Sequence, residues 1–485
     1  MQDGGSQEDL SIRGELPKEG TETEGEHPKI PISVQGLADD EIRLISLFKR
    51  FGEMHYGDPA FRKEFTADPW RTVQKHRFAL SRDQVEDLSR WFSKPSPRPD
   101  CDKHEIVQLG NKYKEAMRSS AFKERAESAA DPRYRAWRAR QVARINSQMR
   151  KCISDEVRHI VVAFELTKGC SMRCWFCSFA APRLSGVFRY TAANAGLWAE
   201  VLEVVKEVLD PSGGAGICYY GTEPMDNPDY EKFCVDFHRQ FGFFPQTTTA
   251  DALRNADRTK ALNRLAYEKS CTVNRFSVLS VSMLRRIHAT FSPEELINVY
   301  LFFMYGLHVC GMSRAGRARQ KAESDSELGR RLTAEYSPAC MSGFMLNMVD
   351  RSVQLVAPCP PSDRWPQGQR IFDTAAFSSA RDLKPIMRSM IDKHMPISLT
   401  SSDPVRFRDD LEYKPIPDGF EVATRFMTRT FRGGRPMSLL GELVREGNRT
   451  AGQVAAVLEG CFVPSSTTSE MLALLLKSAV LDDGT

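Results

Sequence analysis

Apolar and polar positions alternate along residues 158–335 in a way that predicts strands followed by helices. Short apolar runs typical of buried strands are separated by longer amphipathic runs, and this order indicates a parallel α/β architecture. We expect a full or partial (β/α) barrel, with its chemistry at the C-terminal ends of the strands. The predicted strands are Ile160–Leu166, Gly216–Tyr220, Thr247–Ala250, Phe276–Val281 and Leu307–Cys310, and the predicted helices include Leu197–Leu209, Asp229–Phe241 and Pro293–Phe303.

The chain before this region has helical periodicity. Ile42, Ile45, Leu47 and Phe48 share one stripe, so residues 36–150 are predicted to form a helical N-terminal unit. Residues 103–150 are basic, with Arg133, Arg135, Arg138, Arg140 and Arg144 around two aromatic residues. We interpret these arginines as a solvated helix face, with contact to an acidic peptide as the alternative. Residues 1–35 are acidic and nearly free of apolar residues, which predicts a disordered tail, and residues 94–100 read as a linker.

Residues 151–335 are assigned to the core barrel, and two further regions follow it. Residues 336–435 extend the core and contain a predicted hairpin, Phe344–Val349 and Ser352–Ala357, around Asp350-Arg351. Residues 436–485 form a small terminal domain with predicted helices Leu439–Glu446, Ala451–Leu458 and Ser469–Ser478.

Composition narrows the class of protein. The chain has 485 residues, 41% hydrophobic and 27% charged, and no apolar run approaches the roughly 20 residues that cross a bilayer. The formal net charge of +4 gives no reason to expect nucleic acid or a membrane as a partner. The N-terminus lacks a basic head and an apolar core, so we expect a cytoplasmic protein whose twelve cysteines stay reduced.

Three of those cysteines carry the strongest chemical signal. Cys170, Cys174 and Cys177 form a C-x3-C-x2-C pattern directly after the strand Ile160–Leu166. Three thiolates on one loop can bind three irons of a four-iron cluster and leave the fourth open. A zinc site would need a fourth ligand nearby, and no histidine lies between His159 and His238.

This motif resembles that of the radical S-adenosylmethionine (SAM) superfamily, in which an aromatic residue, here Phe176, precedes the last cysteine. The resemblance implies a partial radical SAM barrel, a [4Fe-4S] cluster, and SAM bound to the open iron and cleaved to a 5′-deoxyadenosyl radical. Gly221, Thr222, Glu223 and Pro224 resemble the segment that binds the SAM amino group, although Thr222 replaces a glycine. Thr248 lies on a strand like the one that faces the ribose, and Arg275 and Ser277 resemble polar residues near the SAM carboxylate or ribose.

The late cysteines bear on the reaction. Beyond Cys310 only Cys340, Cys359 and Cys461 remain, too few for the two auxiliary clusters of many peptide-modifying relatives. Residues 340–368 and the helical N-terminal unit resemble radical SAM epimerases of ribosomal peptides, of the proteusin type. The resemblance implies L-to-D conversion of residues in a precursor peptide, with a cysteine returning hydrogen. We favour Cys359 as that donor, then Cys340, then Cys310; a buried structural role is the alternative for each.

The terminal domain, with its apolar helices and the edge Ala479–Leu481, loosely resembles winged-helix domains that add a leader peptide as an extra strand; a plain helical cap is the alternative. We therefore expect a precursor peptide, leader and core, and an electron donor such as flavodoxin or ferredoxin as partners. Two other functions stay open: a radical SAM methyltransferase or crosslinking enzyme acting on a peptide, and a non-catalytic iron–sulfur electron-transfer or regulatory protein.

Overall fold

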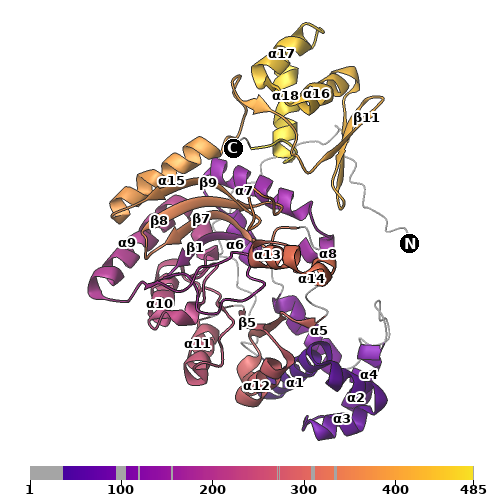
Figure 1. Cartoon of the computed structure of the whole chain (residues 1–485), viewed down its shortest axis with the longest axis vertical. Helices are drawn as coiled ribbons and strands as arrows, with labels where there is room; N and C mark the ends of the chain where they lie inside the picture. Colours follow the sequence, from indigo (N-terminus) through magenta and orange to yellow (C-terminus); the bar gives the residue numbers. More distant parts are fainter. Residues whose placement is uncertain are drawn as a thin grey trace.

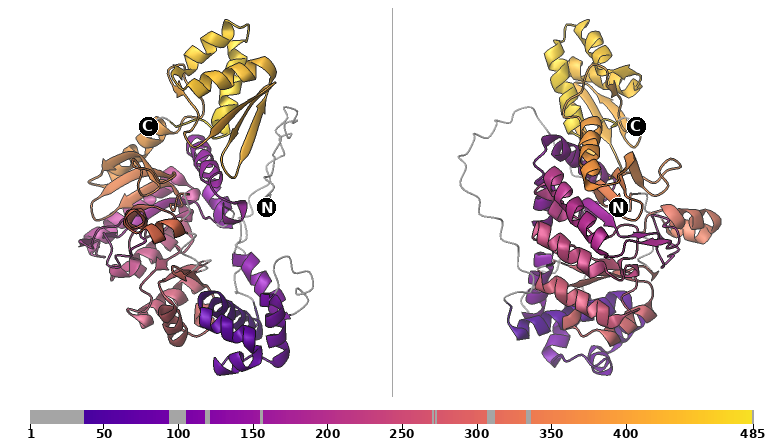
Figure 2. Two further views of the ribbon diagram at one scale, coloured as in Figure 1. Left: turned by 45° about the vertical axis from the view of Figure 1, so that its right-hand side comes forward. Right: turned by 90° about the vertical axis from the view of Figure 1, so that its left-hand side faces the viewer.

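A computed structural model describes residues 37–93, 105–117, 121–154, 157–269, 271, 273–306, 312–332 and 336–483. The predicted tail, the linker 94–100 and the predicted strand Leu307–Cys310 lie outside these ranges. Helices from the start of the chain lie at one end of the molecule, a mixed α/β core occupies the middle, and a terminal unit stands at the other end (Figure 1). Two further views show the same arrangement (Figure 2). No helix in the described ranges is long and apolar enough to cross a bilayer.

The first helices pack against the outer side of one central sheet. Their apolar stripe, with Phe51 and Phe61 at its centre, shares a core with Phe276 and Leu301 of that sheet. Asp58 and Asp68 accept hydrogen bonds from the first free backbone N–H groups of the helices they precede, each followed by a proline. The helices of residues 37–117 are α1 (Asp39–Gly57), α2 (Pro59–Ala67), α3 (Pro69–Lys75), α4 (Arg82–Ser93) and α5 (Glu105–Met117).

The central region contains two larger sheets and one short two-stranded sheet. In the first, β1 (Ile160–Glu165) pairs in parallel with β7 (Met341–Asn347), which pairs antiparallel with β8 (Ser352–Pro358), and β8 with β9 (Gln369–Ala376). In the second, β4 (Thr248–Thr249), β5 (Asn274–Val278) and β6 (Val299–Phe303) are parallel. The ladders of the described residues form separate sheets, so a closed barrel is not shown. The predicted hairpin is confirmed, and of the predicted strand Gly216–Tyr220 only a bridge from Ile217 to Ala163 forms.

Helices cover both sheets. The predicted helices Leu197–Leu209 and Asp229–Phe241 are confirmed as α9, which begins five residues earlier at Ala192, and α10, which begins one residue later at Tyr230. The large apolar core of this region combines α9 and α10 with β1, β7 and β8. The remaining elements are α9 (Ala192–Leu209), α10 (Tyr230–Phe241), α11 (Ala256–Glu268), α12 (Val281–Thr290), α13 (Gly316–Ser324), α14 (Ser326–Arg331), α15 (Ala380–His394), the short pair β2 (Thr167–Lys168) and β3 (Gly186–Val187), and the 3-10 turns η2 (Ser212–Ala215), η3 (Pro224–Asp226) and η4 (Glu294–Leu296).

The predicted helix Pro293–Phe303 is wrong. A single 3-10 turn, η4, is followed by strand β6. Val299 and Leu301 are buried against the first helices, whereas Tyr300 and Phe302 are about half exposed on the opposite face. This alternation has the period of a strand, and β-branched and aromatic residues favour strands, so pairing with β5 outweighs the helix-start signal before it.

Three of the five arginines predicted on a solvated face of α7 (Pro132–Asn146) are buried instead, whereas Arg135 is exposed and Arg133 partly exposed. Arg138, Arg140 and Arg144 are buried. Arg138 donates to the carbonyl oxygens of Ala126 and Ser342, and Arg144 pairs with Asp483 near the end of the chain. Because α7 packs against β7 and α15, these side chains are removed from most solvent and bind backbone carbonyl oxygens and the Asp483 carboxylate instead. Two short helices flank α7: α6 (Ala121–Glu127) and α8 (Lys151–Ser154).

The terminal unit combines a three-stranded antiparallel sheet with three helices. Its apolar core includes Val405, Phe420 and Leu440, so it starts before residue 436, where the sequence analysis places its boundary. Leu481 forms only a single bridge, to Phe407. The elements are β10 (Pro404–Val405), β11 (Glu412–Ile416), β12 (Gly419–Ala423), β13 (Thr428–Arg432), α16 (Gly434–Glu446), β14 (Arg449–Thr450), α17 (Ala451–Glu459) and α18 (Ser465–Lys477).

Candidate active site

The cysteine loop leaves the C-terminal end of β1. Gly169 starts it with a φ of 81°, and a Cβ there would lie 2.3 Å from the Arg183 carbonyl oxygen, so only glycine fits this close approach. Cys170 donates its backbone N–H to Pro182, and Cys177 donates to Cys174. All three cysteines of the motif, Cys170, Cys174 and Cys177, are partly buried.

The three thiols interact with one another. Burial raises the pKa of Cys174 to about 11, the charges of Cys170 and Cys177 act in the same direction, and Arg317 opposes them. Among the described residues, no group of three or more His, Cys, Asp or Glu side chains is close enough to hold a single metal ion. Each thiolate of a four-iron cluster binds a different iron, so its ligands stand further apart than those of one ion. Three partly buried thiols on one loop, close enough for their charges to interact, match the three-thiolate ligand set of a four-iron cluster with one open iron.

Two residues that the sequence analysis did not single out anchor this loop. Asp226 accepts a hydrogen bond of 2.9 Å from the backbone N–H of Ser171, next to Cys170. Arg254 donates to the other oxygen of Asp226, at 3.0 Å, and to the Ser171 hydroxyl, at 2.7 Å. The Asp226 side chain is only 1% exposed. The loop is thus tied to the segment after Glu223, and Asp226, three residues beyond that glutamate, was the available signal.

The turn Gly221–Pro224 follows the segment beside β1. Gly221 has a φ of 59°, where glycine is favoured, and Thr222 is partly buried. The Glu223 carboxylate accepts hydrogen bonds from the Thr249 hydroxyl at 2.5 Å and from the backbone N–H groups of Ala250 and Met225. Burial outweighs these bonds and raises the pKa of Glu223 to about 7. This carboxylate therefore joins the turn to the end of β4.

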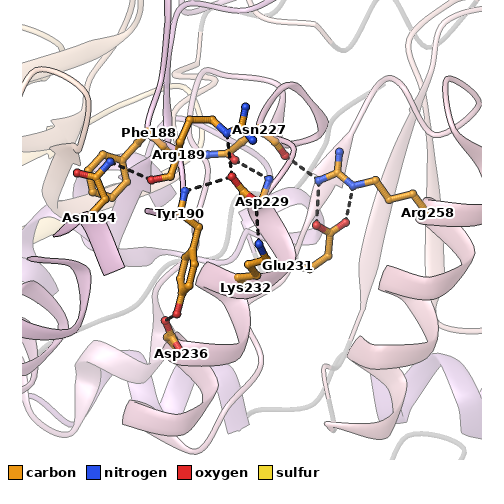
Figure 3. Close-up of polar contacts among 10 residues, drawn as sticks. All are labelled: Phe188, Arg189, Tyr190, Asn194, Asn227, Asp229, Glu231, Lys232, Asp236 and Arg258. Carbon is orange, nitrogen blue, oxygen red and sulfur yellow. Dashed lines mark hydrogen bonds and ion pairs between the residues drawn. The ribbon is translucent and has the colours of Figure 1, made fainter. Parts of the chain in front are cut away.

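A polar network around Asn227 and Asp229 holds the segment that follows Glu223 (Figure 3). Buried Asn227 donates to the carbonyl oxygens of Leu166 and Phe188, and Arg258 donates to the Asn227 carbonyl oxygen at 2.7 Å. Asp229 accepts hydrogen bonds from Arg189 and from the backbone of Tyr190. These bonds fix the backbone after Glu223 relative to the end of β1. They therefore also fix the position of the turn Gly221–Pro224.

The polar residues predicted on the neighbouring strands lie on adjacent positions of one sheet. Thr248 pairs with Arg275, and Ser277 follows on the same face of β5. The Thr248 hydroxyl is 2.6 Å from the Tyr219 hydroxyl. Burial raises the pKa of Tyr219 to about 12 and also raises that of Cys340, and the charge of Arg275 opposes both rises, so its guanidinium lies near both groups. Contact of these residues with SAM stays a prediction.

The two candidate donor cysteines lie at the same end of the hairpin β7–β8, away from its turn, because Cys340 precedes β7 and Cys359 follows its antiparallel partner β8. Cys340 directly precedes β7, and its carbonyl oxygen accepts from the N–H of Ile160 at the start of β1. By this register both cysteines lie near the start of β1, at the other end of the strand from the cysteine loop, and Cys340 contacts the apolar cluster that includes Tyr220. Cys359 follows β8 and donates its N–H to Gly368. Cys310 lies outside the described residues.

The segment after Cys359 returns to the cysteine loop. The Gln367 side chain donates to the carbonyl oxygen of Phe179 at 2.9 Å, and Phe179 packs on the ring of Tyr220. Gly316, at the start of α13, donates its N–H to Pro366, and the next residue, Arg317, donates to the Cys177 carbonyl oxygen. Hydrogen bonds and ring contacts therefore connect the segment after Cys359, the cysteine loop and the residue before the turn Gly221–Pro224.

A mixed α/β core with a three-cysteine loop at the end of its first strand, beside a glycine-led turn, is the arrangement of radical SAM proteins. The family model of the radical SAM superfamily matches residues 164–284, and the chain belongs to this superfamily. Membership implies SAM and usually a [4Fe-4S] cluster. A protein of Sinorhizobium fredii (strain NBRC 101917 / NGR234), named uncharacterized protein y4wI, is 34% identical over 459 residues, covering 92% of this chain and 88% of the relative. No solved structure matches the chain significantly.

Proposed function

We propose that this chain is a radical SAM peptide epimerase, which converts L-residues of a ribosomal precursor peptide to D-residues. The observation that carries the proposal is a partly buried thiol, Cys359, on a segment bonded to the cysteine loop. When bound, the cluster and SAM supply a carbon radical that can remove hydrogen from an unactivated Cα. The residues of the chain must then deliver hydrogen to the other face of that carbon.

The protonation state of the thiol suits this task. Burial raises the pKa of Cys359 to about 12 and also raises that of Cys340, so both stay protonated near neutral pH. In the step, the S–H bond breaks homolytically and a new Cα–H bond forms, which leaves a sulfur radical on the chain. One electron and one proton restore the thiol, and a one-electron donor protein of the iron–sulfur or flavin class supplies the electron.

The terminal unit supports a peptide as the partner. Within the described residues, β13 is an outer strand of its sheet, since it pairs with β12 alone. Arg429 of β13 donates to the carbonyl oxygen of Ser478, just beyond α18. An edge strand beside a helix offers backbone groups to which an extended leader peptide can add as a further strand. We therefore assign recognition of the precursor to this edge.

The test is co-expression of the full chain with a precursor peptide encoded near its gene, in deuterated water, followed by mass spectrometry and chiral amino acid analysis. Each inverted residue should gain one deuterium, because the donor thiol exchanges with solvent. Cys359→Ala should still form 5′-deoxyadenosine but no D-residues, and Cys340→Ala, the matched control, should still invert.

Three results would count against this assignment. Inversion that survives in Cys359→Ala and fails in Cys340→Ala would move the donor to Cys340. Inversion that survives in both variants would refute a donor at either position. A product heavier by a methyl group, or one crosslinked without inversion, would support the alternative class of peptide-modifying enzyme.

A further inference from the structure

Glu165 is a charged residue at the end of an otherwise apolar strand, β1. In the register of the sheet it pairs with Asn347 of β7. The Asn347 side-chain amide donates to Oε2 of Glu165 at 3.0 Å, while its oxygen accepts from the N–H groups of Val349 and Asp350. Because both ends of the amide are used, the orientation of Asn347 is fixed. Its N–H therefore satisfies one oxygen of Glu165.

The other oxygen of Glu165 faces the turn that starts at Gly221. A Cβ placed on Gly221 would lie 3.4 Å from Glu165 Oε1. Among the described residues, none donates a hydrogen bond to Oε1, and no Lys or Arg forms an ion pair with this carboxylate. Other acids in the same chain are better satisfied: Glu53 binds Lys49 and His288.

This arrangement costs stability unless a ligand completes it. Glu165 is partly buried, and desolvating a carboxylate without a full set of partners is unfavourable; this desolvation raises its pKa to about 7, against the hydrogen bond from Asn347 and with Asp350 adding to the rise. Such perturbed groups concentrate at functional sites. A ligand with N–H donors and a positive charge would pair with Oε1 and favour the ionised form of Glu165.

We propose that Glu165 binds the α-ammonium group of SAM, next to the turn at Gly221. Glu223, the acid within that turn, is already bonded to Thr249, Ala250 and Met225, so Glu165 is the carboxylate with an oxygen to spare. An ammonium has three N–H donors and can bind Glu165 and backbone carbonyls of the turn together. The proposal rests on membership in the superfamily and not on epimerisation.

The test compares two ligands that differ in the amino acid part. SAM carries the ammonium, whereas 5′-methylthioadenosine has the adenosine and a thioether but no amino acid part. Binding of each to the reconstituted full chain is measured by equilibrium dialysis, with iron content checked for every variant. In Glu165→Gln, the fixed Asn347 N–H requires the glutamine oxygen to face it, so the glutamine NH2 takes the place of Oε1. The glutamine NH2 group then faces the SAM ammonium, and two donors cannot form a hydrogen bond with each other. We therefore expect SAM to bind at least about tenfold more weakly, and methylthioadenosine to bind with unchanged affinity.

A second substitution should restore the acceptor. In Glu165→Gln with Asn347→Asp, one oxygen of the new aspartate side chain can accept from the two backbone N–H groups and the other from the glutamine NH2. The glutamine oxygen then faces the turn, and SAM affinity should recover in part. If Glu165→Gln loses its cluster, Glu165→Asp, which keeps the charge but shortens the reach, should show the same selective weakening of SAM binding.

Unchanged SAM affinity in Glu165→Gln, or equal weakening for both ligands, would overturn the proposal. Failure of epimerisation alone would not, because SAM binding is measured without a peptide. The two proposals can therefore fail separately.

Discussion

The anchor of the cysteine loop gives a sharp prediction for Asp226→Asn. The Asp226 carboxylate accepts from the Ser171 N–H with one oxygen and from Arg254 with the other. An asparagine has one oxygen, so in either orientation its NH2 faces a donor and one bond is lost. A hydrogen bond involving a charged group contributes about 1.5–3 kcal/mol. Because Arg254 is about half exposed, solvent screens its charge, and we take a loss of about 2 kcal/mol, which corresponds to roughly 30-fold.

The assay measures the rate at which a chelator removes iron from the reconstituted cluster. The decrease in visible absorbance of the cluster is recorded under anaerobic conditions. Asp226→Asn should lose iron about 30-fold faster than the unmodified chain, if the anchor closes the loop around its ligand. Asp236→Asn is the matched control, because Asp236 also accepts from one neutral donor, the Tyr190 hydroxyl, and one arginine, Arg239, but does not touch the loop. Equal rates of iron loss in the two variants would refute the anchoring role of Asp226.

Three further predictions concern pH, backbone fit and the terminal unit. The folded pKa of Glu223, about 7, exceeds its ordinary value of 4.5, so stability from this group is present at low pH and lost as pH rises from about 5 to 8, by about 3 kcal/mol; urea titrations should show a smaller loss in Glu223→Gln, with the part due to Glu165, whose pKa is also about 7, retained. Gly316→Ala should reduce 5′-deoxyadenosine formation measured by chromatography, because φ is 53° and the new Cβ would lie 2.2 Å from the Ser178 carbonyl oxygen; full activity would contradict the fit. Leu440→Ala should destabilise the terminal unit by about 2–5 kcal/mol in thermal melts, since Leu440 is fully buried, while iron content stays unchanged.

Local patterns in the sequence determined several parts of this protein. The cysteine spacing after an apolar strand indicated the cluster loop and its superfamily, and the family match supports that membership. The hairpin β7–β8 and the helices α9 and α10 also followed from the sequence, because turn residues and regular apolar spacing act over a few neighbouring positions. The role of each cluster cysteine and the epimerase reaction stay predictions.

Contacts between distant segments could be decided only by the tertiary structure. Residues 299–303 became a strand because β5 offered an edge to pair with. Arg138 and Arg144 of α7 became buried because carbonyl oxygens next to β7 and near the chain end accept their hydrogen bonds. The pairing of Glu165 with Asn347 spans 182 positions. Such partners leave no periodicity in the sequence, since the free energy of a buried polar group depends on which donors the fold brings to it.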